Sequence, residues 1–219
     1  MLKDWWTALL DIIYPPKCPV CRINVTVHGS WCPKCLAIVF VPREINLAGH
    51  HLKALDSCRV VCEYAGGVRR LIHDMKFREA GHYAAYLTWL VDRGVDPKAF
   101  SGIDLVIPVP LHARRLAERG YNQTERIFGK WAEQQGLNWA DNVLVRVRPT
   151  MPQWELQLSA RRKNIKGAFG IMRPEAIKGK NILLVDDIFT SGTTMEECAR
   201  QLKQAGAVRV DGLALASGA

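Results

Sequence analysis

The chain has 219 residues, 48% of them hydrophobic, and a formal net charge of +9 at pH 7. This is enough for one main core of ordinary size and a small appendage. No apolar segment reaches the length of a bilayer span, which excludes a protein built from membrane-spanning helices. A soluble, cytoplasmic protein is therefore expected.

The N-terminal segment is predicted to be an amphipathic helix that ends at Pro15-Pro16. Two acids, Asp4 and Asp11, interrupt its apolar run, and no small-residue cleavage site follows, so it is not a signal peptide. Its apolar residues fall at helical spacing, which favours packing on the body of the protein over binding to a membrane. They are Leu2, Trp5, Trp6, Leu9, Leu10 and Ile13.

Four of the seven cysteines form two close pairs, Cys18 with Cys21 and Cys32 with Cys35. Each pair can bind one tetrahedral ion from a tight turn, and four thiolates close the coordination shell, so the spacing predicts structural Zn²⁺. The alternatives are free thiols or a site emptied during handling. Since so short a segment cannot build a sound core, zinc would hold it folded by about 10 kcal/mol. Residues 1–50 are therefore expected to form an N-terminal helix and zinc-binding domain.

The other cysteines are interpreted as core thiols. Cys58 and Cys62 lie four apart in a predicted strand, which would place both on one face, and Cys198 falls in the last predicted helix. The pair His50-His51 has no matching partner in the sequence and is not predicted to bind a metal.

Residues 51–219 alternate between strand and helix patterns. This alternation predicts an α/β domain, a mostly parallel sheet with helices on both faces. The predicted strands are 57–64, 104–110, 143–147, 169–172, 181–186 and 208–216. The predicted helices are 68–77, 82–93, one capped by Asn122, and 193–205, with a loop over 111–121 and a long basic loop over 149–168 that contains a short helical piece. Residues before 57 that follow the zinc region are expected to form a loop.

The segment 182–194 carries the most specific signal in the chain. A buried apolar strand leads into Asp186 and Asp187, and a turn of small hydroxyl residues and glycine then opens a helix. Such a turn presents backbone N–H groups and a helix N-terminus to a phosphate. The two acids suit neighbouring sugar hydroxyls or a bound Mg²⁺, so the segment predicts a site for a ribose 5-phosphate. The alternative is an ordinary buried strand followed by a capped helix.

This segment resembles the phosphoribosyl-pyrophosphate (PRPP) motif of type I phosphoribosyltransferases. The resemblance implies that Asp186 and Asp187 are catalytic and that the 5-phosphate of Mg²⁺-bound PRPP lies on the turn Thr190, Ser191, Gly192, Thr193 and Thr194. Purine-salvage enzymes with a similar motif carry an Asp where this chain has Thr190. That departure argues against hypoxanthine or guanine as the acceptor.

Two basic segments are candidates for the pyrophosphate end of PRPP. One follows the strand that ends at Pro110, with Leu111 and three arginines, Arg114, Arg115 and Arg119. The other is the loop around Arg161, Arg162, Lys163 and Lys166, which can close over the departing pyrophosphate. For both, the alternative is a solvated basic surface. Residues 111–173 hold twelve Lys/Arg and five Asp/Glu, so +7 of the net charge lies there, which suits a polyanion.

Taken together, these pieces resemble the ComF/GntX-like phosphoribosyltransferases over nearly the whole chain. Several segments carry the resemblance. They are the two cysteine pairs Cys18–Cys21 and Cys32–Cys35, called the zinc knuckles below, then Tyr64–Ile72 with Lys76, Val109–Leu111 ahead of Arg119–Gln123, Gln157 with Leu158, Arg162, Asn164, Ala168-Phe169 and the PRPP motif. The resemblance places Lys76 and Arg162 among the PRPP-binding residues. It also implies a role in natural competence, in which the protein handles incoming single-stranded DNA and meets other competence-machinery proteins.

Two functions remain open from the sequence. One is a phosphoribosyltransferase with an unassigned acceptor. The other is a nucleic-acid-binding module in which the PRPP site is a sensor or an unused scaffold, and in which exposed tryptophans stack on bases.

Overall fold

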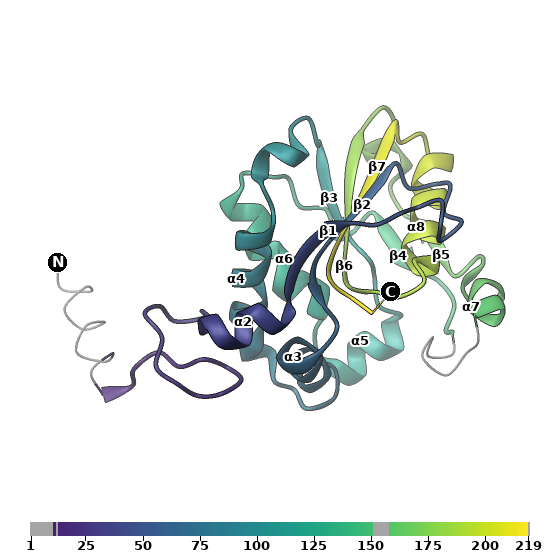
Figure 1. Ribbon diagram of the computed structural model, residues 1–219. Coiled ribbons are helices and arrows are strands. Elements are labelled where there is room, and N and C mark those ends of the chain that lie inside the picture. The colour runs from purple at the N-terminus through teal and green to yellow at the C-terminus, as the bar shows by residue number, and fades with distance from the viewer. Residues whose placement is uncertain (1–10, 12, 151–157, 219) are drawn as a thin grey trace.

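The structure is a computed structural model that describes residues 11, 13–150 and 158–218 (Figure 1). The predicted N-terminal helix lies almost wholly outside the described residues. In the described part, the helices are α2 (Pro33–Val39), α3 (Gly66–Phe77), α4 (Ala84–Gly94), α5 (Ala113–Arg119), α6 (Gln123–Gln134), α7 (Leu158–Ile165) and α8 (Thr193–Gln204). The strands are β1 (Phe40–Glu44), β2 (Ser57–Glu63), β3 (Leu105–Pro108), β4 (Leu144–Arg146), β5 (Phe169–Ile171), β6 (Asn181–Phe189) and β7 (Arg209–Ser217).

A five-stranded sheet in the order β1-β2-β7-β6-β3 forms the centre of the protein. β2, β7, β6 and β3 are parallel, and β1 is antiparallel to β2 at one edge. The prediction of a mostly parallel sheet is therefore confirmed. Because the parallel strands share one direction, their carboxyl ends meet along one edge, where ligands of such sheets bind.

Helices cover both faces of this sheet (Figure 1). One buried cluster joins α3, α4 and α6 to residues such as Val106 and Val185, and a second joins α8 to residues such as Ile107 and Leu184. Neighbouring strand residues thus point to opposite faces, and each face is buried under its own helices. The predicted fold class, an α/β sheet with helices on both faces, is confirmed.

Two local predictions were wrong, and one strand was missed. Residues 113–119 are not loop but the helix α5, and the edge strand β1 lies at residues 40–44, where no strand was predicted. β4 and β5 do not join the main sheet, since they pair with each other as a separate antiparallel sheet. Cys58 and Cys62 are both fully buried, which confirms that they are core thiols, and Cys58 packs in the cluster of α8 while Cys62 packs in the cluster of α4.

Strand β6 also runs further than predicted. It continues through both acids to Phe189 and stays paired with β7 as far as Ser217. Asp186 and Asp187 are therefore consecutive residues of a strand, and their side chains leave opposite faces of the sheet. Every helix in the described ranges is too short or too polar to traverse a bilayer.

Candidate functional site

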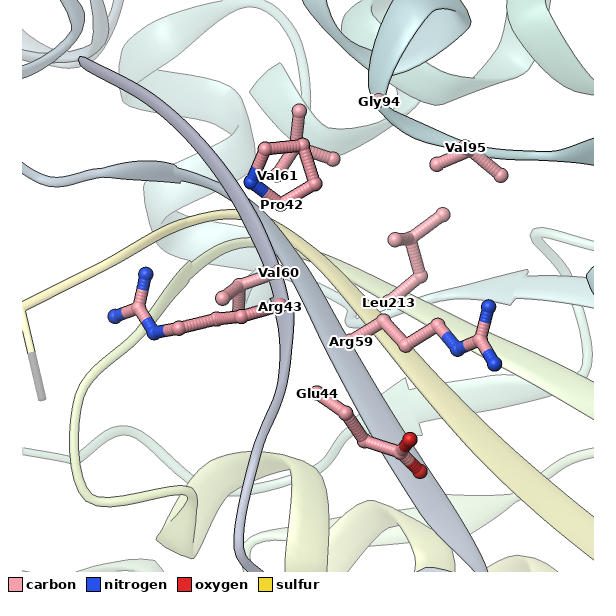
Figure 2. Close-up of a pocket in the computed structure, with 9 residues that line it drawn as sticks. All are labelled: Pro42, Arg43, Glu44, Arg59, Val60, Val61, Gly94, Val95 and Leu213. Carbon is pink, nitrogen blue, oxygen red and sulfur yellow. The ribbon is translucent and has the colours of Figure 1, made fainter. Parts of the chain in front are cut away.

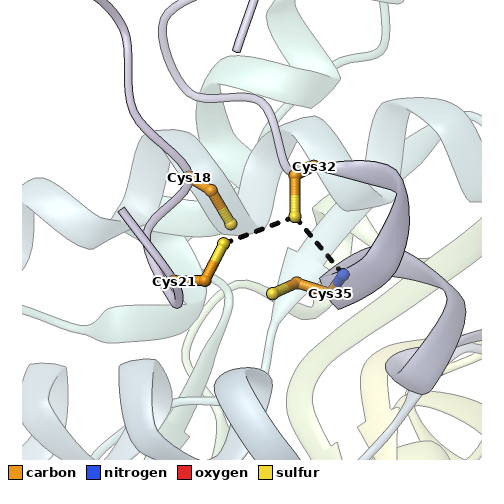
Figure 3. Close-up of side chains that lie close together, drawn as sticks. All are labelled: Cys18, Cys21, Cys32 and Cys35. Carbon is orange, nitrogen blue, oxygen red and sulfur yellow. Dashed lines mark hydrogen bonds between the residues drawn. The ribbon is translucent and has the colours of Figure 1, made fainter. Parts of the chain in front are cut away.

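The side chains of the four zinc-knuckle cysteines, Cys18, Cys21, Cys32 and Cys35, point toward one another (Figure 3). Their Sγ atoms all lie within 4.8 Å of one another. Four sulfurs at about 2.3 Å from a tetrahedral zinc lie roughly 3.8 Å apart, so the geometry fits one Zn²⁺. Burial favours a raised pKa for Cys18, but backbone N–H groups of Cys32, Cys21 and Val20 outweigh it and lower that pKa to about 6, which favours the thiolate that binds metal.

The two acids of β6 lie at the carboxyl edge of the main sheet, and both are buried, with Asp186 9% and Asp187 4% exposed. The Asp187 N–H donates to Asp186 Oδ1 at 2.8 Å, and the hydroxyl of Thr124, in the first turn of α6, lies 3.5 Å from the same oxygen. Burial, and then the charge of Asp187, raises the pKa of Asp186 well above its usual range, while Lys76 acts against this. The pair is thus costly to keep charged without a ligand.

Lys76 supplies the counter-charge from the last turn of α3. Its Nζ lies 2.7 Å from Asp187 Oδ2, and the two side chains are 21% and 5% exposed. The structure therefore brings together Lys76 and Asp187, two predicted site residues 111 positions apart in the chain.

The turn after β6 is shaped by Gly192, whose φ is +74°. A Cβ at this position would lie 2.5 Å from Leu52 Cδ1 and 2.7 Å from Phe189 Cζ, so only glycine fits. Helix α8 begins at Thr193, directly after this turn, and Ser191 Oγ lies 3.1 Å from Thr193 Oγ1. The turn therefore presents the N-terminus of a twelve-residue helix at the same sheet edge as the two acids.

Strand β3 ends beside β6, with Pro108 opposite Val185, and the chain then enters α5 through Pro110 and Leu111. At the end of α5, the half-buried Arg119 donates to the side-chain carbonyl of Gln123. Burial lowers the pKa of Arg119, and the nearby charge of Asp187 raises it. Arg119 thus faces the acids, whereas Arg114 is 82% exposed and bonds to Glu118 at 2.8 Å on the outer side of α5.

Two further predicted cations lie at the surface. Arg115 is exposed on α5, and Arg162 on α7 donates to the His50 carbonyl at 3.2 Å. The His50 ring packs edge-on against Phe189 at 5.3 Å between centroids, which connects α7 to the end of β6 and the turn Thr190–Thr194 through the 45–56 loop.

Sequence reasoning missed Arg146 of β4. Its Nε is buried and has no hydrogen-bond partner among the described residues, and burial, the main effect, lowers its pKa. A bridge pairs its backbone with His112, so it lies beside the segment after Pro110. The available signal was a single cation inside the predicted strand 143–147, whose other residues are apolar, which is unusual unless the strand borders a site.

A pocket of about 230 Å³ lies elsewhere in the described residues (Figure 2). It is lined by Pro42, Arg43, Glu44, Arg59, Val60, Val61, Gly94, Val95 and Leu213, none of which is a predicted site residue. Arg59 stands opposite Glu44 in the β1–β2 register, and Arg43 lies 2.8 Å from Glu63. These acids compensate both arginines, so the pocket does not suit a polyphosphate.

Two family descriptions match the chain. Residues 9–46 match the double zinc ribbon domain, and residues 133–217 match the phosphoribosyl transferase domain. The first match supports structural zinc on the four cysteines.

Among proteins with similar sequences, DNA utilization protein YhgH of Salmonella typhi is 30% identical over 207 residues, which cover 88% of this chain and 86% of that protein. Competence protein F of Haemophilus influenzae is 29% identical over 213 residues, with 92% and 85% covered. Among solved structures, the glutamine PRPP amidotransferase from B. subtilis aligns with a TM-score of 0.39 and 17% identity, over 62% of this chain and only 26% of that one.

The two relatives match along most of their length, and the zinc ribbon and phosphoribosyl transferase matches fall where the cysteine cluster and the Asp186–Thr194 segment lie. The chain therefore belongs to the ComF family, as a phosphoribosyltransferase-like protein with an N-terminal double zinc ribbon.

Proposed function

We propose that the chain binds Mg²⁺-PRPP at the carboxyl edge of its sheet and transfers the phosphoribosyl group to an acceptor. The observation that carries this proposal is the buried pair Asp186–Asp187 next to the glycine turn that begins α8. A buried acid pair with one lysine partner is unfavourable in the free protein, and it is explained by a ligand that needs both carboxylates.

Each part of PRPP has a matching group. The 5-phosphate lies on Thr190–Thr194, where the start of α8 offers backbone N–H groups and the helix dipole. The ribose hydroxyls lie near Asp186 and Asp187. The pyrophosphate lies near Pro110, Leu111 and Arg119. Arg146, whose backbone pairs with that of His112, lies beside this segment.

The exposed cations serve a different purpose. Arg114 and Arg115 attract the polyanion, and Arg162 closes over it, which requires Arg162 to leave the His50 carbonyl. In transfer, the bond from C1 of the ribose to the pyrophosphate oxygen breaks, and its electron pair leaves with the pyrophosphate. A lone pair of the acceptor forms the new bond to C1, and the proton on the attacking atom passes to solvent. The carboxylates favour the positive charge that develops on the sugar, while Arg119 and Arg146 favour the leaving group. Mg²⁺, when bound with PRPP, neutralises phosphate charge.

Calorimetry of Mg²⁺-PRPP binding tests this assignment. Asp186→Asn combined with Asp187→Asn is expected to abolish binding while circular dichroism remains that of the folded protein. Asp141→Asn, an exposed acid outside the site, is the matched control and should bind as the original chain does. Equal affinity in the double variant and the control would refute the site. A screen for acceptor-dependent release of pyrophosphate then tests for turnover.

A second function is supported by the exposed cations Arg148, Arg162, Lys163 and Lys166 and by the names of the relatives. We propose that this surface holds single-stranded DNA during competence. Affinity should then fall with salt, with a logarithmic slope of about 0.7 for each phosphate contacted. Arg162→Glu with Lys163→Glu should reduce both affinity and slope, and Lys178→Glu, an exposed lysine elsewhere, should not. A salt dependence with a slope near zero would exclude this role. If the Asp186/Asp187 substitutions leave the affinity for DNA unchanged, the two functions are separate.

A further inference from the structure

Helix α3 connects the zinc ribbon to the candidate site. Its first turn packs against the cysteine knuckles, and its last turn carries Lys76, which contacts Asp187 at 2.7 Å. Lys76 lies nine positions after Gly67, which corresponds to about 13.5 Å along a helix. A short, continuous helix of this kind transmits a displacement at one end to the other.

The contact at the first turn is close and specific. A Cβ at Gly67 would lie 2.3 Å from Val20 Cγ2 and 2.9 Å from Trp31 Cζ3, so the helix approaches the ribbon as nearly as a glycine permits. Val20 lies between Cys18 and Cys21, and Trp31 directly precedes Cys32. Helix α3 therefore packs on the two turns that present the metal-binding thiols.

Two hydrogen bonds fix the ribbon against the body. Arg70 of α3 donates through Nη2 to the Pro19 carbonyl at 2.5 Å, and Trp31 Nε1 donates to the Tyr86 carbonyl of α4 at 3.0 Å. Both partners on the ribbon side again lie next to knuckle cysteines. A small hollow of about 150 Å³ borders the same contact, and its lining includes Cys35 as well as Gly67 and Arg70.

The far end of α3 is held by a separate contact. Tyr121, between α5 and α6, donates its hydroxyl to the Met75 carbonyl at 2.6 Å. The last turn thus has an anchor on the body, while the first turn starts with Gly66 and Gly67, two residues of very low helix propensity. The first turn thus depends on the ribbon for its order.

The ribbon in turn depends on its metal. The segment that carries the four cysteines is too short for a core of its own, so the knuckles keep their shape through the metal that joins them. Without it, Val20, Pro19 and Trp31 lose their fixed positions against Gly67 and Arg70.

We infer that the zinc-loaded ribbon holds α3 in the position from which Lys76 meets Asp187, so that zinc occupancy sets the affinity of the site for Mg²⁺-PRPP. Gly67 and Arg70 are positioning residues: they contact the zinc ribbon and act on the PRPP site only through helix α3. The inference rests on the proposed PRPP binding.

The test compares three forms of the full chain: zinc-loaded, zinc-depleted by a chelator that is removed before Mg²⁺-PRPP is added, and zinc-loaded Arg70→Ala. Arg69→Ala, an exposed neighbour, is the matched control. Hydrogen exchange along α3 and calorimetry with Mg²⁺-PRPP are both measured. We expect zinc depletion and Arg70→Ala to speed exchange along α3 as far as Lys76 and to weaken PRPP binding about tenfold, within the usual range of coupling between sites, while Arg69→Ala changes neither.

The outcomes separate the two claims. If the zinc-loaded chain does not bind Mg²⁺-PRPP, the proposed function fails, and faster exchange at Lys76 after zinc depletion still supports the coupling. If it binds PRPP equally well in all forms, or if faster exchange stops at the first turn of α3, the inference is overturned. Arg70→Ala keeps the zinc ligands, so the comparison survives even if the zinc-depleted chain unfolds.

Discussion

Breaking the Lys76–Asp187 pair should destabilise the free protein strongly and in a pH-dependent way. Removing one partner of a buried ion pair costs about 3–5 kcal/mol, and Lys76 is 21% exposed, so the lower end, about 3 kcal/mol, is expected for Lys76→Met. For a chain of this size, that corresponds to a fall in Tm of about 6 to 12 °C. Asp187→Asn should cost less, because it also removes the charge that, after burial, contributes most to the raised pKa of Asp186.

The pH dependence follows from Asp186. Lys76 acts to lower the pKa of Asp186, so its removal raises that pKa further in the folded state. A carboxyl whose pKa is higher in the folded than in the unfolded chain favours folding only while it is protonated. Stability is therefore lost as pH rises from the ordinary aspartate range through the raised value, and the deficit of Lys76→Met should be smaller at pH 5 than at pH 8.

Thermal and urea unfolding of Lys76→Met, Asp187→Asn and the double variant measure the coupling directly. The double variant should recover about 2 kcal/mol relative to the sum of the single changes. Lys178→Met, at an exposed lysine with no ion pair found in the described part of the chain, is the control and should stay within about 0.5 kcal/mol of the original protein. A Lys76→Met variant as stable as this control at pH 8 would refute the reasoning.

Three further predictions have defined outcomes. Gly192→Ala should cost about 1–3 kcal/mol in urea unfolding and weaken PRPP binding, because a Cβ there would lie 2.5 Å from Leu52 and φ is +74°; a neutral result would contradict the geometry of the turn. Arg146→Met should weaken pyrophosphate binding in calorimetry and leave the zinc content by atomic absorption unchanged, whereas Cys32→Ser should lower the zinc content; the opposite pattern would reverse these assignments. Burial, the main cause, raises the pKa of Cys58 and Cys62 to about 12, so both thiols should resist iodoacetamide at pH 8 until urea unfolds the chain, and their contribution to stability should be lost as pH rises from about 9 through 12; rapid labelling of the folded chain would contradict their burial.

Much of the fold could be predicted because its signals are local. The apolar run before Asp186 and the capping residue Asn122 both act within a few residues, and β6 and α6 begin where these signals place them. Strand β1 was missed because Phe40–Glu44 contains Pro42 and lacks a clear alternation, so only its pairing with β2 makes it a strand. Helix α5 was missed because Pro108 and Pro110 suggested an extended loop, whereas His112 caps a helix directly after them.

The candidate site could be predicted in its motif but not in its contacts. The order of residues 186–194 indicates a phosphate turn, yet nothing local shows that Lys76 reaches Asp187 or that Arg114 turns outward to Glu118. Such contacts depend on how α3 and α5 pack at the sheet edge. The local sequence also did not predict that β6 continues past Asp187, because this extension depends on pairing with β7. The domain boundary expected at residue 50 stays a prediction.

The strand order has a consequence for how the chain is made. β7 lies between β2 and β6, although it is the last strand in the sequence. A ribosome therefore releases β1 and β2, and later β3 and β6, as two separate halves that have no shared backbone pairing until residues 209–217 emerge. A nascent chain that stops before β7 would expose two unpaired inner strand edges, so a premature stop codon there should yield an aggregating product in place of a shortened but folded one.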